Sequence, residues 1–457
     1  MKIIKEFGFY IFCFLIYASC SSKDPRPHII LIYTDDMGIG DLSSLKGQVV
    51  ATPHIDQLAK EGKIFEQYYS NAPVCSPSRV AVTTGMYPLK WGINTFLSAR
   101  KFNAKCEQQD YLEASAPSLA KQLHQSGYAT GHFGKWHMGG GRDVRNAPSI
   151  HEYGFDEYVS TYESPDADPL LTFKNWIWSP EDSIKRWDRT AYFVDKALAF
   201  LDQHKDQPCY INLWPDDVHS PWVPYEDVQD DKSEWFALHN LVPVIEEFDR
   251  QIGRLLTELD HRGLTENTLI IFTSDNGPAP SFDRLRTNQL RGIKNSLYEG
   301  GIRMPFIVRW PAKIEAGQRD VVSVISAIDL FPTLCAITNT PVDQRLDGID
   351  FSMSLISTET ITDRQLFWDY GRNPHFKFPQ GRDRSPQLAM RDGQWKFLCN
   401  VDGTQTELYN LAIDPREQEN QAIAHPDLVD RYTITLQQWY VESDQSMITK
   451  ELLTSDL

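Results

Sequence analysis

Short apolar segments alternate with helical patterns along most of the chain, and this alternation limits the possible folds more than any other feature of the sequence. Apolar runs at residues 28–33, 209–214 and 268–273 have the length of buried strands. Residues 55–62 and 238–259 instead repeat apolar side chains at the spacing of a helix. Strands that alternate with helices form a mainly parallel or mixed sheet. We therefore predict an α/β fold with one large sheet flanked by helices.

The pattern changes after about residue 357, where shorter strand-like segments follow one another. These segments and the hairpin dipeptides between them are residues 388–391, 395–400 and 407–411, with Asp392-Gly393 and Asp402-Gly403. A helical pattern covers residues 428–443. We therefore expect a main domain over residues 24–357 and a C-terminal subdomain over residues 358–457, made of a small antiparallel sheet plus a helix.

The N-terminus has the layout of a signal peptide over residues 1–20. Lys2 and Lys5 precede an apolar run at residues 7–18 that is too short to span a bilayer. The run ends in Tyr-Ala-Ser-Cys at residues 17–20, which resembles a bacterial lipobox with Cys20 as the lipidated residue. Its first residue, a tyrosine, departs from that pattern and leaves ordinary cleavage open. We expect an exported protein in the periplasm or at the cell surface, anchored to the membrane through Cys20.

Charge and cysteine content limit the partners of the chain. The formal net charge of −17, without a long basic block, disfavours nucleic acid as a partner, so an anionic substrate must meet a local cluster of positive groups. Four cysteines lie outside the leader and the motif described below: Cys106, Cys209, Cys335 and Cys399. Their wide spacing matches neither a zinc site nor a dense disulfide framework, and their pairing stays open.

Acidic and amide side chains follow two of the predicted strands. Asp35 and Asp36 come after the first apolar run, and Asp275 and Asn276 come after the run at residues 268–273. Each pair alone would be read as a turn or a helix cap. Strand ends of an open α/β sheet meet in one crevice, where these oxygen atoms suit Ca²⁺ or Mg²⁺ rather than zinc or copper.

The most specific string is Cys75-Ser-Pro-Ser-Arg79, within NAPVCSPSRVAVTTGMYP at residues 71–88. A lone cysteine in a turn would be read as a buried thiol. The whole stretch, however, closely resembles the signature of type I sulfatases, of the alkaline phosphatase-like superfamily. In that family a separate maturing enzyme, either formylglycine-generating or anaerobic sulfatase-maturing, oxidises this cysteine to formylglycine (3-oxoalanine). An apolar helix after Arg79 would also place Cys75 near a helix N-terminus, which favours an anion.

The resemblance implies a covalent mechanism. The formylglycine aldehyde hydrates to a geminal diol, one hydroxyl attacks sulfur, and deprotonation of the other expels sulfate and restores the aldehyde. Similarity to sulfatases makes Asp35, Asp36, Asp275 and Asn276 the ligands of one Ca²⁺ per chain, together with the modified Cys75. Arg79 would hold the formylglycine and a metal-bound oxygen in place.

Three further motifs are similar to sulfatase elements. Gly-Lys-Trp-His-Met-Gly at residues 134–139 contains Lys135, which would contact sulfate, and His137, which would contact the nucleophile. Two residues apart, both can face one side of an extended chain. His219, before Ser-Pro, would donate a proton to the leaving oxygen, and Lys294 would bridge sulfate and that oxygen. Without this context, a packed histidine or a surface lysine would be the usual reading.

Taken together, the motifs imply a sulfuric ester hydrolase acting on a sulfated carbohydrate or polysaccharide. Residues that could contact such a glycan are Trp214, Asp216, Asp217, Arg284, His375, Arg382 and Arg384, with Trp176, Trp178 and Trp222 as further aromatic candidates. The segment 373–384 would form a pocket wall. Two alternatives remain: a phosphate or phosphonate ester hydrolase of the same superfamily, and a non-catalytic binder of sulfated glycans if Cys75 is not matured.

Overall fold

The computed structural model describes residues 26–174, 176–226, 234–342, 344–372 and 378–454. The predicted signal region with Cys20, and the candidate His375, lie outside these ranges. Within them, no helix combines the length and the hydropathy that a membrane span requires.

An eight-stranded sheet forms the centre of the molecule, with the strand order β10-β2-β9-β7-β1-β6-β4-β5. The strands are β1 (His28–Thr34), β2 (Lys63–Phe65), β4 (Ala129–Gly134), β5 (Glu157–Ser160), β6 (Cys209–Trp214), β7 (Thr268–Ser274), β9 (Phe306–Arg309) and β10 (Gln318–Asp320). Strands β7, β1, β6, β4 and β5 run parallel, whereas β9 is antiparallel to β7 and β2. The predicted mixed, mainly parallel sheet is therefore confirmed.

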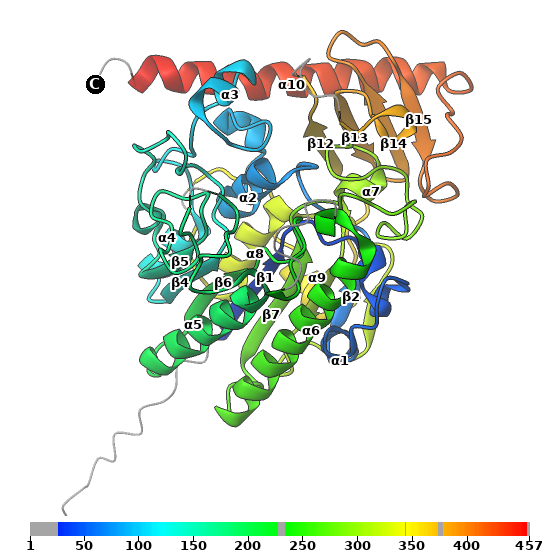
Figure 1. Ribbon diagram of the computed structural model, residues 1–457. Coiled ribbons are helices and arrows are strands. Elements are labelled where there is room, and N and C mark those ends of the chain that lie inside the picture. The colour runs from blue at the N-terminus through cyan, green and yellow to red at the C-terminus, as the bar shows by residue number, and fades with distance from the viewer. Residues whose placement is uncertain (1–25, 175, 227–233, 343, 373–377, 455–457) are drawn as a thin grey trace, which may run out of the picture.

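Helices cover both faces of this sheet because its central strands are apolar on both sides. Ile30 and Ile32 of β1 pack with α1 (Pro53–Lys60), α5 (Arg189–Gln203) and α6 (Leu238–His261), which lie together in Figure 1. Ile29 and Leu31 pack on the other face. The helices there are α2 (Cys75–Thr84), α4 (Leu119–Gln125) and α8 (Leu330–Ile337). This two-sided burial explains the continuous apolar run of β1.

Short elements complete the main domain. They are α3 (Arg100–Lys105), α7 (Glu299–Ile302), α9 (Ser352–Ile356) and a three-stranded sheet of β3 (Tyr68–Tyr69), β8 (Arg303–Met304) and β11 (Ile325–Ser326).

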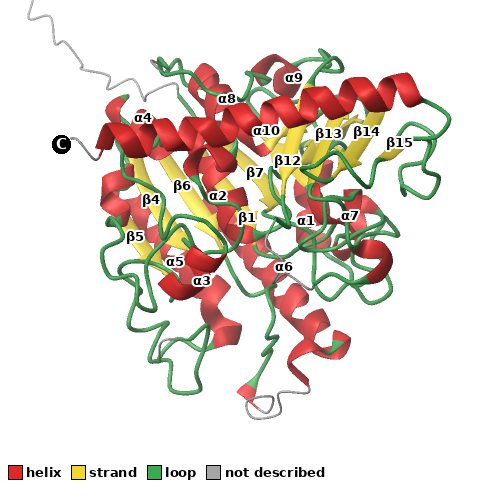
Figure 2. Ribbon diagram, turned by 90° about the horizontal axis from the view of Figure 1, so that it is seen from above, coloured by secondary structure: helices red, strands yellow, loops and turns green. Residues whose placement is uncertain are grey.

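The C-terminal part contains an antiparallel sheet and a long helix. The strands are β12 (Gln365–Asp369), β13 (Leu388–Asp392), β14 (Trp395–Cys399) and β15 (Glu407–Asn410), in that order. Helix α10 (Pro426–Thr454) runs along this sheet and past the main domain (Figures 1 and 2), where Trp439 contacts Tyr87. The observed helix is longer than the predicted residues 428–443, because an apolar pattern marks only the part of a helix that packs.

The parallel strands determine where functional side chains meet. Strands β7, β1, β6 and β4 are neighbours, so the segments that follow them lie at one edge of the sheet. Helix α2 begins at Cys75, so the structure confirms that Cys75 lies at a helix N-terminus, although the helix starts before Arg79 rather than after it.

Candidate active site

The structure brings the four predicted oxygen ligands together. Asp35 and Asp36 follow β1, and Asp275 and Asn276 follow the adjacent β7. The Asp36 backbone N–H donates to Asp275 Oδ1 at 3.1 Å, and Asn276 Nδ2 donates to Asp36 Oδ1 at 2.7 Å. The Asp36 backbone has φ of 62°, a left-handed conformation that aspartate tolerates. All four side chains are buried.

Three buried or nearly buried cations surround these carboxylates. Lys135 Nζ lies 2.8 Å from Asp35 Oδ2, Lys294 Nζ lies 2.7 Å from Asp36 Oδ1, and Arg79 Nη2 lies 2.7 Å from Asp275 Oδ2. Burial alone would raise the pKa of Asp35, but Lys135 and the other nearby positive charges outweigh burial and hold that pKa well below its usual value. The neighbouring cations therefore keep the Asp35 carboxylate negatively charged.

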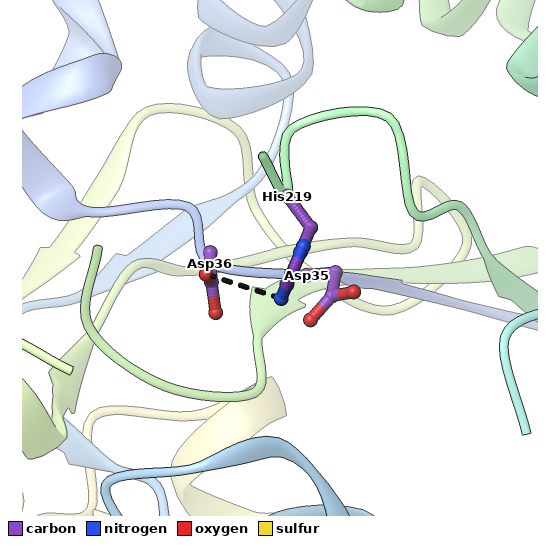
Figure 3. Close-up of side chains that lie close together, drawn as sticks. All are labelled: Asp35, Asp36 and His219. Carbon is purple, nitrogen blue, oxygen red and sulfur yellow. Dashed lines mark ion pairs between the residues drawn. The ribbon is translucent and has the colours of Figure 1, made fainter. Parts of the chain in front are cut away.

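The donor set fits a hard divalent cation. Asp35 Oδ1 and Asn276 Oδ1 are buried and have no hydrogen-bond partner among the described residues. Unpartnered buried oxygen atoms are costly unless something else satisfies them, and carboxylate and amide oxygens are the ligands that Ca²⁺ or Mg²⁺ prefers. Potential ligand atoms of Asp35, Asp36 and His219 also lie within 4.8 Å of one another. Figure 3 shows these three side chains close together. The sequence had not included His219 in this group.

Cys75, at the first turn of α2, lines a cavity of about 500 Å³. Lys135, His137, His219 and Lys294 line the same cavity. Burial raises the pKa of the Cys75 thiol, so the unmodified side chain is a poor nucleophile at neutral pH. Arg79 lies one turn further along α2, and its Nη1 donates to the Lys135 carbonyl oxygen at 2.9 Å. All the predicted catalytic side chains except Arg79 therefore line this cavity, and Arg79 contacts Lys135, which does.

Lys135 and His137 reach the cavity by a different geometry from the one expected. The prediction assumed an extended chain, whereas His137 has φ of 53° and Gly134 and Gly139 have φ of 131° and 124°. The strand ends at Gly134, and left-handed residues turn the following backbone so that both side chains still line the cavity. The glycines of this motif therefore serve the turn.

Both cavity histidines favour the neutral state in the free protein. Burial is the main reason that the pKa of His137 and the pKa of His219 each fall to about 4. The neighbouring Lys294 lowers the pKa of His219 further. A bound sulfate would bring negative charge next to these rings and raise both pKa values.

Glu163 is a cavity residue that the sequence reasoning missed. Its carboxylate lies 3.1 Å from His137 Nε2, 3.2 Å from Arg142 Nη2 and 3.9 Å from Lys135 Nζ. Burial would raise the pKa of Glu163, but His137, Lys135 and Arg142 together lower it. The residue belongs to no recognised motif, yet it follows β5, so a search of strand ends could have found it.

Aromatic side chains also line this cavity. Phe96, Tyr162, Trp176, Trp235 and Phe236 line the cavity, and Trp176 and Phe236 are 47% and 52% exposed. Exposed aromatic faces beside polar groups are typical of sites that hold sugar rings. Among these residues, the sequence analysis had named only Trp176.

The structure places three of the predicted substrate contacts inside the protein, where other residues contact them. Trp214 is buried, with the Arg79 guanidinium 5.2 Å from the centre of its ring. Asp216 pairs with the buried Arg186 and with Arg189 at 3.0 Å. Asp217 is buried and accepts from the backbone N–H of Thr190 at 3.0 Å.

The remaining candidates divide between packing and surface. Trp178 and Trp222 are buried, and Arg284 pairs with Asp383 at 2.7 Å. Arg382 is exposed and lines neither this cavity nor the one beside it. Phe378, Pro379, Gly381 and Arg384 line that second cavity, so the described part of the segment 373–384 forms a pocket wall as predicted.

Comparisons with known proteins agree along nearly the whole described chain. The sulfatase family model matches residues 27–340, and the model of the C-terminal part of N-sulphoglucosamine sulphohydrolase matches residues 293–438. An N-acetylgalactosamine-6-O-sulfatase of Bacteroides thetaiotaomicron is 30% identical over 491 positions, which cover 88% of this chain and 91% of that protein.

Two solved structures are similar at the level of the fold and the sequence. A structure from work on glycosaminoglycan metabolism by Bacteroides thetaiotaomicron has a TM-score of 0.73 at 27% identity, covering 92% of this chain and 100% of that one. Ps i-CgsB in complex with k-i-k-neocarrahexaose also has a TM-score of 0.73 at 27% identity, covering 92% of this chain and 94% of that one.

Proposed function

The chain belongs to the sulfatase family and is a sulfuric ester hydrolase acting on sulfated carbohydrates, and on this premise we propose that its nucleophile is formylglycine made from Cys75. The observation that carries the proposal is the shared cavity of Cys75 and four basic side chains, Lys135, His137, His219 and Lys294. An anionic sulfate needs positive charge, which Lys135 and Lys294 supply in this acidic chain of net charge −17. A separate maturing enzyme would carry out the oxidation of Cys75.

Two lysines hold the sulfate. Burial would lower the pKa of Lys135, but Asp35, Cys75 and Glu163 together outweigh burial and raise it. The pKa of Lys294 is raised in the same way, chiefly by Asp36. Both side chains therefore stay positively charged over the whole physiological range, and they stabilise the charge that develops on the sulfate and the leaving oxygen.

Asp35, Asp36, Asp275 and Asn276 would hold one Ca²⁺ together with the modified residue 75. The bound ion would neutralise sulfate charge and lower the pKa of the attacking hydroxyl. Asp35 Oδ1 and Asn276 Oδ1 support this assignment, because neither atom has a hydrogen-bond partner among the described residues. Arg79 contacts both Asp275 and the Lys135 carbonyl oxygen. It would therefore hold the proposed metal ligands and Lys135 in fixed positions relative to one another.

The two histidines would move the protons. His219 lines the cavity and would donate a proton to the leaving alcohol oxygen. His137 would take the proton whose loss releases sulfate from residue 75. The negative charge of the bound sulfate supplies the rise in pKa that His219 needs in order to carry this proton.

We also propose that the protein acts outside the cytoplasm, anchored through Cys20. A relative named as an N-acetylgalactosamine-6-O-sulfatase and a similar structure holding neocarrahexaose support a polysaccharide fragment as the substrate. Membrane fractionation of wild type and Cys20→Ala tests the anchor, because only a lipidated protein would shift to the soluble fraction after this substitution.

Peptide mass spectrometry of the Cys75 region tests the nucleophile, beside sulfate release from a panel of sulfated sugars. We expect the mass change of thiol-to-aldehyde conversion in active protein, and loss of activity in Cys75→Ala. Cys399→Ala, which alters another buried thiol, is the control and should stay active. Unmodified Cys75 in active protein would contradict the proposal, and faster release of phosphate than of sulfate would favour a phosphoesterase.

A further inference from the structure

A second cavity lies beside the proposed catalytic cavity. Its volume is about 440 Å³, and it forms where the C-terminal sheet meets the loop that carries Lys294. Asn295, the next residue, lines both cavities. A ligand longer than one sugar ring can therefore occupy both cavities at once.

Arg384 gives this second cavity a positive charge that no described side chain pairs with. Within the described residues, its guanidinium makes no hydrogen bond or ion pair. The neighbouring Asp383 does not compensate it, because Asp383 Oδ1 already accepts from Arg284 at 2.7 Å and from the Gly292 backbone at 3.2 Å. In an acidic chain, an exposed and unpaired arginine in a cavity favours an anionic group.

The other lining residues suit a sugar. Gln387, Asn400 and Gln405 supply amide groups for hydroxyls, and Phe378, 49% exposed, supplies a flat apolar face. Asn295 Oδ1 is buried without a partner in the described part of the chain. Amides, an aromatic face and one arginine together match a hexose ring that carries a carboxylate or a sulfate.

We propose that the second cavity binds the anionic sugar adjacent to the one that loses its sulfate, with Arg384 contacting the carboxylate or sulfate of that neighbour. This inference rests on the proposed function, because it assumes that the first cavity holds the scissile sulfate. It implies that the enzyme distinguishes glycans by the charge of the neighbouring sugar.

The test compares wild type with Arg384→Gln on substrates that fill one cavity or both. An aryl sulfate and a sulfated monosaccharide need only the first cavity. Oligosaccharides with a uronate, a sulfated or a neutral neighbouring sugar need both. We expect kcat/KM to fall about tenfold to a hundredfold for one of the two anionic neighbours and to stay unchanged for the aryl sulfate, the monosaccharide and the neutral neighbour. The arm that falls identifies the anion as carboxylate or sulfate.

Arg382→Gln is the matched control, because Arg382 is two positions away and lines neither cavity. It should leave every arm unchanged. Equal losses on mono- and oligosaccharides in Arg384→Gln, or no loss at all, would overturn the proposal.

Binding provides a test that does not depend on turnover. Calorimetric titration of desulfated oligosaccharides carrying a uronate neighbour, and of oligosaccharides carrying only a sulfated neighbour, compares wild type with Arg384→Gln. For the anion that is recognised, we expect the Kd of the variant to be about tenfold higher than that of wild type. Equal Kd values of wild type and variant, for each of the two anions, would overturn the inference. If wild type releases sulfate from none of the substrates while this difference in Kd persists, the proposed catalysis is wrong and the proposed binding site in the second cavity is supported.

Discussion

Two clusters of buried charge in this molecule look alike in burial and differ in what surrounds them. The open cluster consists of Asp35, Asp36, Asp275 and Asn276 with their cations. The closed cluster consists of Glu299, Lys396 and Glu417, where Lys396 Nζ lies 2.9 Å from each carboxylate. Tyr69 and the Glu299 backbone N–H satisfy the remaining oxygens of the closed cluster at 2.8 and 2.7 Å.

The difference separates binding from structure. The open cluster adjoins a cavity through Lys135 and Lys294, and its Asp35 Oδ1 and Asn276 Oδ1 have no hydrogen-bond partner in the described residues. The closed cluster ties β14 to α7 and adjoins neither of the two cavities described above. Burial and charge alone therefore do not identify a functional site, and neither does a missing hydrogen bond, because Glu417 Oε1 also lacks one although Lys396 lies 2.9 Å away. The adjacent cavity is what distinguishes the open cluster.

Asp36→Asn should break the open cluster with the largest effect. The substitution keeps the side-chain shape but removes a negative charge from the proposed metal site, so we expect kcat/KM to fall about a hundredfold to a thousandfold. Sulfate release and metal titration measure it. Glu417→Gln makes the same change in the closed cluster and should stay within about threefold of wild type. Comparable activity losses in both variants would refute the distinction.

Lys396→Met should break the closed cluster. Removing the lysine leaves the buried Glu417 without a paired cation and leaves Glu299 with only Arg303, 3.7 Å away, so we expect a loss of about 3–5 kcal/mol of unfolding free energy. Urea unfolding measures the loss, and the activity of the folded fraction should be preserved. Lys174→Met, which removes an exposed ion pair with Glu181, should leave stability nearly unchanged. Equal stabilities of the two variants would show that Lys396 carries no structural charge.

Glu417→Gln should change how stability depends on pH. Burial and then the nearby Glu299 raise the pKa of Glu417 to about 7, partly offset by Lys396. A carboxyl with a raised pKa binds its proton more tightly when folded. Its contribution to stability is therefore complete below the unfolded pKa of about 4.5 and is lost as pH rises through about 7.

Urea unfolding at several pH values between 5 and 8 checks this sign. Wild type should lose about 2 kcal/mol more across the window than Glu417→Gln does. The lowered pKa of Glu299 acts in the opposite sense, but below this window. Parallel pH curves for the two proteins would show that Glu417 does not titrate there.

Glu163→Gln should have the smallest effect of these substitutions. It tests the comparison of the two clusters, because Glu163 pairs with cations and also lines the cavity. Loss of its charge should loosen His137 and Lys135 and lower kcat about tenfold, with a smaller change in KM. The pH profile of kcat should shift to lower pH, because the histidine loses a nearby negative charge. Asp166→Asn, an exposed carboxylate of the same loop, is the control. An unchanged pH profile would assign Glu163 a purely structural role.

Much of the fold and the site could be predicted because the relevant signals are local. The apolar runs of β1, β6 and β7 and the hairpins around β13 and β14 appear where periodicity and Asp-Gly dipeptides predicted them. The cavity contains the motif residues Cys75, Lys135, His137, His219 and Lys294, which the sequence named. Glu163 and the aromatic wall belong to no motif and escaped prediction.

The sequence by itself determined the class of fold, the family and the residues at the strand ends, because hydrophobic period and motif spacing are properties of short segments. Only the tertiary structure decided which charges neutralise one another. Asp216 meets Arg186 and Arg189, and Lys396 meets Glu299, 97 positions away. Such pairings depend on which distant segments the sheet and its helices bring into contact, and no local pattern encodes them. For the same reason, only the tertiary structure shows that Arg384 lines a second cavity without an ion-pair partner among the described residues.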